Sequence, residues 1–148
     1  MHVLLALALA AAVASTGPDP TQANKVARVR AEIQVIHATR GDKFVDPSLK
    51  SLKRYLENSF GTRYQSFKLL GKSSMPLSRA QRQTQKLPNE TELALTFLGT
   101  QASRLRLLME VGGMKTTVKV HDGGLFFQAG RRYKAGMLVV AIRVHALQ

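Results

Sequence analysis

Apolar and polar residues alternate along most of the chain after residue 25. In residues 25–38, apolar side chains occupy one parity and polar side chains occupy the other. The apolar set is Ala27, Val29, Ala31, Ile33 and Val35, and the polar set is Arg28, Arg30, Glu32 and Gln34. A period of two residues is typical of a β-strand that buries one of its faces.

Similar patterns predict further strands at 62–71, 91–99, 103–111, 114–120 and 125–130. In the middle strands the predicted inward residues are Leu93, Leu95, Phe97, Leu105, Leu107, Met109, Val111, Met114, Thr116, Val118 and Val120. The last strand, 136–147, is apolar on both parities, so we expect it at the centre of a sheet with both faces covered.

Glycine-containing pairs separate several of these strands. Gly112-Gly113 and Asp122-Gly123 each predict a hairpin. Residues 71–76 read as a turn or loop, and 129–136 read as a second turn near the end of the chain. Residues 77–87 have no apolar period and predict either an exposed edge strand or a polar ribbon, whose cations would discourage pairing between sheet edges.

One helix is predicted, over residues 47–60. Asp46 stands at the N-cap position and Pro47 in the first turn, where its missing N–H is not needed. Gly61 supplies a stop. The apolar residues recur at three- and four-residue spacing, namely Leu49, Leu52, Leu56 and Phe60. We expect this amphipathic stripe to pack on a sheet; a helix on a membrane surface is the alternative.

These elements predict a mainly β fold with seven or eight short strands and one helix. The spacing favours an antiparallel β-sandwich or a small barrel, with the helix on one side or end. An α+β fold built on a single antiparallel sheet is the main rival. The predicted folded unit is one β-rich domain over residues 25–148.

The N-terminal residues differ in composition from the rest of the chain. Residues 1–14 are a continuous apolar run that ends in Ala12-Val13-Ala14, which predicts a cleaved signal peptide. An uncleaved anchor and an apolar N-terminus of a cytosolic protein are the alternatives. Residues 15–24 are rich in Pro, Gly and small polar residues and predict a linker. We therefore expect an exported protein, in the periplasm or outer envelope of a bacterium.

The composition narrows the chemistry further. The chain has 148 residues, no Cys and a formal net charge of +13, and residues 1–14 carry none of that charge. Without thiols, the domain cannot use disulfides, thiol catalysis or Cys-based zinc sites. The basic balance favours anionic partners: acidic polysaccharide, cell-wall polymer, lipid head groups or extracellular nucleic acid. A solvated basic surface with no single partner is the alternative.

Cations at the polar parity of the strands are the predicted binding residues. They could form one basic sheet face for a phosphate-rich or otherwise anionic ligand, using Arg28, Arg30, Arg104, Arg106, Lys115 and Lys119. A second cluster lies between flanking glycines and has no evident core role: Arg131, Arg132, Tyr133 and Lys134. Phe126 and Phe127 should point to opposite sides of their strand, so at most one of them is free to stack on a ligand.

Catalytic and metal-binding patterns are sparse. The four His residues have no local pairing, and a meeting of His37, His121 and His145 in the fold is the one metal arrangement left open. No G-x-S-x-G motif is present. We predict no catalytic residues, no metal and no cofactor, and the few aromatics give no support for sequence-specific nucleic-acid recognition. We expect membrane contact only at the periphery.

Residues 116–130 resemble a short stretch of the secretins, the outer-membrane channel family. The resemblance rests on Thr116, Thr117, Val118, Val120, Asp122, Gly123 and Gly130. As a whole, the chain resembles the small exported β-rich proteins of bacterial envelopes that have no assigned activity. The resemblance implies an envelope location and a hairpin at Asp122-Gly123, and it carries over no functional residues.

Three functions are consistent with these patterns. The leading hypothesis is a non-enzymatic structural or accessory subunit of an envelope assembly, docking on an envelope protein or on a second copy. The alternative is a basic binding module for an anionic polymer or lipid. A hydrolase whose residues meet only in the fold is the third.

Overall fold

A computed structural model describes residues 26–147. The predicted signal peptide at 1–14 and linker at 15–24 lie outside this range. The described chain forms nine strands in two sheets and one helical segment, which consists of η1 followed by α2. The elements in chain order are β1 (Arg28–Thr39), β2 (Phe44–Val45), η1 (Pro47–Leu52), α2 (Lys53–Phe60), β3 (Ser66–Ser78), β4 (Arg82–Lys86), β5 (Glu92–Gln101), β6 (Arg104–Val111), β7 (Met114–Val120), β8 (Gly124–Tyr133) and β9 (Gly136–Leu147).

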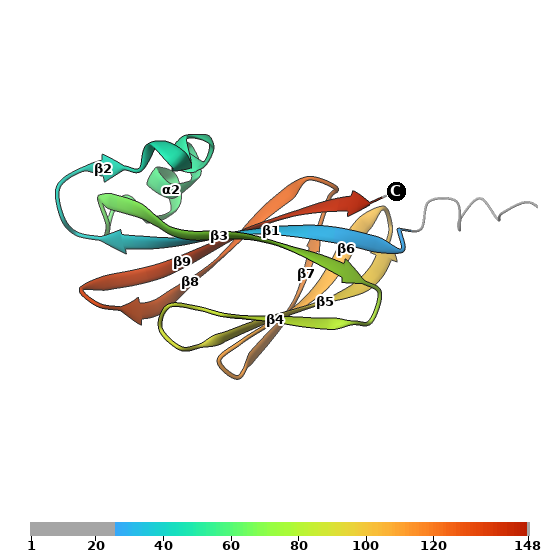
Figure 1. Ribbon diagram of the computed structural model, residues 1–148. Helices are drawn as coiled ribbons and strands as arrows, with labels where there is room; N and C mark the ends of the chain where they lie inside the picture. The colour runs from blue at the N-terminus through green and yellow to red at the C-terminus, as the bar shows by residue number, and fades with distance from the viewer. Residues whose placement is uncertain (1–25, 148) are drawn as a thin grey trace, which may run out of the picture.

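The two sheets pack face to face (Figure 1). The first sheet has the order β2-β3-β1-β9-β8, and the second has the order β4-β5-β6-β7. All strand pairs are antiparallel except the short pair of β2 with β3. The predicted mainly β fold is confirmed, as a sandwich or half-barrel with more strands than expected.

A large apolar core fills the space between the sheets. In β1, β5 and β6 the inward residues are those that the alternation predicts, including Ile33, Phe97 and Leu107, each with none of its surface exposed. The prediction fails on β7, where Met114 and Thr116 are exposed and only Val118 and Val120 reach the core. The buried positions of β7 are therefore confined to the C-terminal end of the strand.

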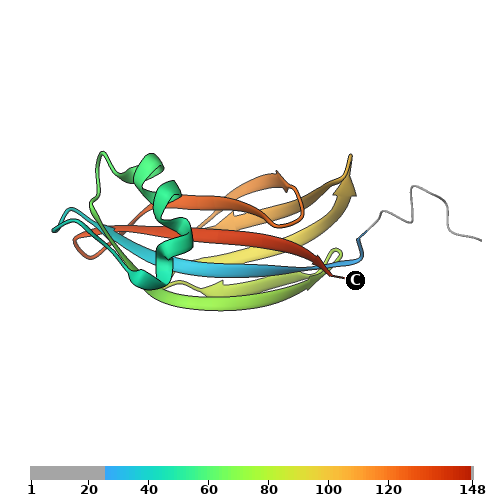
Figure 2. The same ribbon diagram turned by 90° about the horizontal axis from the view of Figure 1, so that it is seen from above.

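A second apolar cluster lies between the helical segment and the outer face of the first sheet (Figure 2). The helix contributes Leu49, Leu52 and Leu56, and β9 contributes Met137 and Val139. The alternate residues of β9 face the other sheet, so β9 is covered on both faces, as its sequence predicts. The helix therefore packs on a sheet, and its apolar stripe is used in doing so.

The helical segment begins where the sequence predicts, although it is not one regular α-helix. Asp46 caps it, since the carboxylate accepts hydrogen bonds from Ser48 N (3.0 Å), Ser48 Oγ (2.7 Å) and Leu69 N (3.1 Å). These bonds, led by the one from the Ser48 hydroxyl, lower the pKa of Asp46 below its ordinary value. The first turn is 3₁₀ and bends at Leu49 before α2 begins.

Residues 71–76 are a strand and not the expected turn. They continue β3, which pairs with β1 along its whole length and shifts register opposite Val35 and Ile36. Met75 and Leu77 point into the core and hold this half of β3 in place. Pro76 fits because β2 pairs only with Ser66 and Phe67, which leaves the rest of β3 as an edge. Residues 82–86 form the edge strand β4, one of the two structures expected there.

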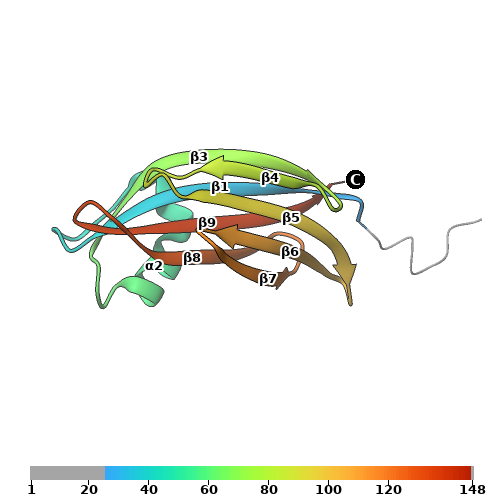
Figure 3. The same ribbon diagram turned by 90° about the horizontal axis from the view of Figure 1, so that it is seen from below.

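Asp122-Gly123 turns the chain, but it does not close a hairpin within one sheet. It connects β7 of the second sheet to β8 of the first. The two strands lie side by side as edges of opposite sheets (Figure 3). The Asp122 carboxylate accepts a hydrogen bond from Ala146 N (2.8 Å), and Gly123 N donates to Val144 O (2.7 Å), so the turn is anchored on β9.

Candidate ligand-binding surfaces

The predicted binding residues lie in three separate places. Arg28 and Arg30 belong to the outer face of the first sheet, and the four cations of β6 and β7 belong to the outer face of the second. The cluster at 131–134 lies at the end of β8. The expectation of one basic face is therefore wrong. The alternation along a strand shows which of its two faces is polar, but it does not show which sheet the strand joins.

The second sheet carries a row of cations across three strands. Arg106 on β6 lies directly opposite Lys119 on β7, and Arg104 follows two positions along β6. On its other side, Arg106 lies opposite Gly99 of β5. The guanidinium of Arg79 occupies the space that a side chain at Gly99 would need, with Arg79 Nε 3.3 Å from the position of a Cβ there. We call these four cations the basic row: Arg79, Arg104, Arg106 and Lys119.

The basic row lacks acidic partners. Within residues 26–147, the acidic groups that form ion pairs are Glu32, Glu90, Glu92 and Glu110, and none of them pairs with a member of the row. Arg106 Nε is buried and has no hydrogen-bond partner there. Residues directly opposite each other on a sheet have Cβ atoms about 5 Å apart, so like charges at such positions repel each other. An anion bound across the two side chains would relieve this repulsion.

The opposite end of the same face is neutralised. Arg82 pairs with Glu110 (3.0 Å) and Glu92 (3.6 Å), and its hydrogen bond to Glu110 raises the pKa of Arg82 above its ordinary value. Lys115, one of the predicted binding residues, also reaches Glu110 (3.8 Å). Lys86 pairs with Glu90 (3.5 Å). The uncompensated positive charge therefore gathers at one end of the second sheet.

Sequence reasoning missed Arg79 as a member of the row. It lies in the connection between β3 and β4, and an isolated parallel bridge to Phe97 places it beside β5. Its residue type alone gave no signal. The one sequence signal was Gly99, because a Gly inside a strand often marks a bulge or a place where another group approaches the backbone closely.

The cluster at 131–134 has structural contacts that the sequence did not indicate. Arg131 and Arg132 belong to β8, so the turn is only Lys134-Ala135 and not the whole of 129–136. Arg131 Nη2 donates to Val111 O (2.9 Å) and Gly112 O (3.2 Å) on the other sheet. The Tyr133 ring packs edge-on against His37 (5.1 Å between centroids) and adjoins the core.

The two remaining members of this cluster are exposed. The ammonium of Lys134 lies over the Tyr133 ring, 5.3 Å from its centroid, while its backbone takes a positive φ of 49° in the turn. Arg132 is exposed and its side chain is available to a ligand. Of the four predicted residues, two hold the structure together and two face solvent.

Arg28 and Arg30 lie on the half of the first sheet that the helix leaves uncovered. Their neighbours are largely engaged with one another. His145 Nε2 is 3.3 Å from Glu32 Oε2, and Arg143 Nη1 donates to Gly123 O (2.8 Å). A small polar hollow of about 150 Å³ lies beside them, under the start of the helix, with Glu32, Lys72 and Arg143 in its wall.

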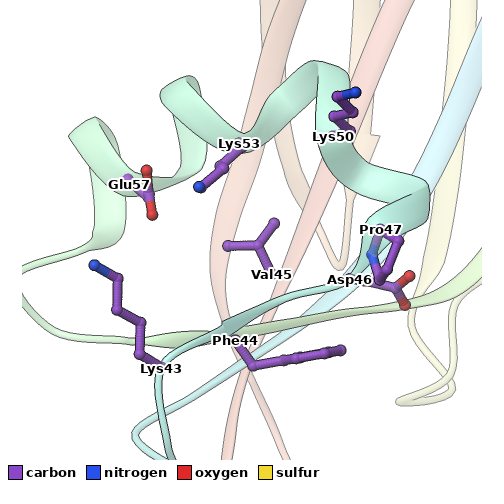
Figure 4. Close-up of a pocket in the computed structure, with 8 residues that line it drawn as sticks. All are labelled: Lys43, Phe44, Val45, Asp46, Pro47, Lys50, Lys53 and Glu57. Carbon is purple, nitrogen blue, oxygen red and sulfur yellow. The ribbon is translucent and has the colours of Figure 1, made fainter.

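Two hollows larger than this one lie against the helix. One, of about 400 Å³, lies between β2 and the helix and is lined by Lys43, Phe44, Val45, Asp46, Pro47, Lys50, Lys53 and Glu57 (Figure 4). A neighbouring hollow of about 450 Å³ shares Lys43 and Glu57 and extends over Phe67 and Tyr64. None of these residues was predicted as a site.

Histidines do not meet as a metal site in the described part of the chain. His37 Nε2 lies 3.0 Å from Tyr133 O, His145 contacts Glu32, and His121 is exposed. No three His, Asp or Glu residues between 26 and 147 are arranged to hold a metal ion. Between residues 26 and 147, no helix is long and apolar enough to cross a bilayer.

Comparison with known proteins gave no match to any protein-family model, curated protein or solved structure.

Proposed function

We propose that this protein is a non-catalytic binding module for an anionic polymer, and that the basic row is its binding surface. The observation that carries this proposal is a row of four cations that no carboxylate of residues 26–147 neutralises by an ion pair. Arg106 and Lys119 lie directly opposite each other, and an anion bound across them would relieve the repulsion between their charges. The row crosses several strands, which suits an extended chain of charges.

The expected export of the chain indicates which polymers to consider. Envelope polysaccharides and cell-wall polymers carry repeated carboxylates or phosphates, and a Lys or Arg side chain binds either group through charge-assisted hydrogen bonds. The basic row contains no aromatic side chain on which a base could stack, which favours a polymer bound through its charges. The ligand class is therefore a linear polyanion recognised by charge spacing.

The test is polymer binding by variants of the row. We expect Arg104→Gln with Lys119→Gln to weaken binding of polygalacturonate or polyphosphate by about fivefold for each charge removed. The slope of log affinity against log salt should fall by about 0.7–0.9 for each removed contact. Titration at several NaCl concentrations measures both quantities.

Lys86→Gln is the matched control, because Lys86 lies on the same sheet and is paired with Glu90. Lys86→Gln removes one formal charge, as each single row substitution does, and it should change the affinity by less than Arg104→Gln or Lys119→Gln alone. Equal losses in the control and in the row would show that net charge, and not this surface, accounts for binding. An affinity that does not change with NaCl concentration would also contradict the proposal.

A structural role in an assembly is a second candidate, and the open edge of the first sheet favours it. Strand β8 pairs only with β9, so the other edge of its ten residues faces outward over most of its length. Unpaired edge strands accept further strands, and a second copy of β8 is the simplest partner. We expect a dimer with Kd in the micromolar range by sedimentation, with slower amide exchange in β8 at high concentration. A monomer up to millimolar concentration would exclude this arrangement.

A further inference from the structure

We propose that the groove between β2 and the helix is a second binding site, for a single-chain anionic amphiphile. The groove is formed by the two hollows that share Lys43 and Glu57. It lies on the first sheet and away from the basic row, so it does not depend on the function proposed above. Each hollow falls within the range of roughly 300–1,000 Å³ that is usual for small-molecule sites.

The floor of the groove is apolar. Val45 points up from β2 toward the helix (Figure 4). Pro47 closes one end, and the half-buried Tyr64 and the buried Phe67 continue the apolar surface into the second hollow. An inorganic anion or a sugar would leave this surface wet, whereas an acyl chain would cover it. Apolar area removed from water contributes about 25 cal/mol per Å².

Three of the five charged side chains that line the first hollow lie toward one end of it, and Lys50 points away from it (Figure 4). The carboxylate of Glu57 lies between the ammonium group of Lys53, on the same helix, and that of Lys43, which rises from the opposite wall (Figure 4). No ion pair within 4.0 Å joins Glu57 to either lysine in the described structure. The other acid of the lining, Asp46, is occupied by its three capping hydrogen bonds. The groove therefore presents a net positive charge to one head group.

Together, the apolar floor and the single charged point favour a molecule with one anionic head and one apolar tail. The shared polar chemistry is that of a carboxylate or phosphate monoester, bound by two ammonium groups. A cationic amphiphile would meet Lys43 and Lys53 directly and would be repelled. A neutral one would gain no charge-assisted hydrogen bond from either lysine.

Titration with dodecyl phosphate below its critical micelle concentration tests the site. We expect saturable binding of one molecule per chain, with NMR shift changes confined to residues 43–67. Lys53→Gln should weaken binding about tenfold, and Glu57→Gln should strengthen it several-fold. Opposite signs from two neighbouring residues of one helix are a signature that a general loss of structure would not produce.

Arg54→Gln is the matched control, because Arg54 is adjacent to Lys53 on α2 and does not line the groove. It should leave the affinity within about twofold of the parent. Equal effects of Arg54→Gln and Lys53→Gln would overturn the proposal, as would competition by inorganic phosphate at the same concentration. Binding seen only with vesicles containing anionic lipid would also overturn it and would identify a membrane-surface contact instead.

Discussion

Replacing Phe97 with Ala is expected to lower the free energy of unfolding by about 3–5 kcal/mol, the usual cost of removing a large core aromatic. Phe97 has none of its surface exposed and lies in the core between the two sheets. Its carbonyl also accepts a hydrogen bond from Ala80 N (2.8 Å), which ties the start of β4 to β5. Truncating this side chain to Ala would leave a cavity in the core.

A loss of this size is a large share of the 5–15 kcal/mol that holds a typical domain folded. Urea denaturation of the parent and the variant measures it, with both midpoints and slopes compared. Phe44→Ala is the matched control, since Phe44 is 42% exposed on the short strand β2. We expect the control to lose less than about 1 kcal/mol. A similar loss in both variants would mean that the core is not centred where the structure places it.

Phe97 also illustrates what the sequence could predict. In a strand, successive side chains point to opposite faces, so a buried Leu93 and Leu95 require a buried Phe97 as long as the strand stays regular. The same rule predicted the inward residues of β1 and β6 and the two covered faces of β9. These predictions depend only on local geometry, which is why they were correct.

Long-range pairing could not be predicted in the same way. The turn at Asp122-Gly123 shows that the chain reverses, but not whether the next strand joins the same sheet. Here β8 pairs with β9 and leaves β7 as the edge of the other sheet. Likewise, the break expected at residues 71–76 is absent, because Met75 and Leu77 gain burial by extending β3 along β1.

The candidate site was predicted in part for the same reason. Parity correctly assigned Arg104, Arg106 and Lys119 to an outer face. The predicted hairpin at Gly112-Gly113 places Glu110 opposite Lys115 and Arg106 opposite Lys119. Neither parity nor the hairpin could show that Arg106 lies near no carboxylate, because that also depends on which strand lies on the other side of β6. Nor could they place Arg79 over Gly99, since the two residues meet only through the corner between β3 and β4.

Substitutions in the cluster at 131–134 distinguish a structural role from a binding role, because adjacent residues of the cluster differ in their contacts. Arg131→Ala is expected to lower the free energy of unfolding by about 1–2 kcal/mol, because it removes two charge-assisted hydrogen bonds between the sheets. Its neighbour Arg132 is exposed, and Arg132→Ala should change stability by less than about 0.5 kcal/mol. Urea denaturation of both variants, at matched ionic strength, measures the difference.

Gly112 provides an independent check on the same contact. Its backbone has a φ of 53°, and a methyl group there would collide with the guanidinium of Arg131. Gly112→Ala should therefore destabilise the parent more than it destabilises Arg131→Ala, with a coupling of about 0.5 kcal/mol or more in a double-mutant cycle. Two results together would instead identify the cluster as the ligand site that its sequence predicts. The first is additivity of Gly112→Ala and Arg131→Ala. The second is weaker polyanion binding, with unchanged stability, in both Arg131→Ala and Arg132→Ala. Otherwise Arg131 connects the two sheets across their open side, and Arg132 and Lys134 are the members of the cluster that a ligand can reach.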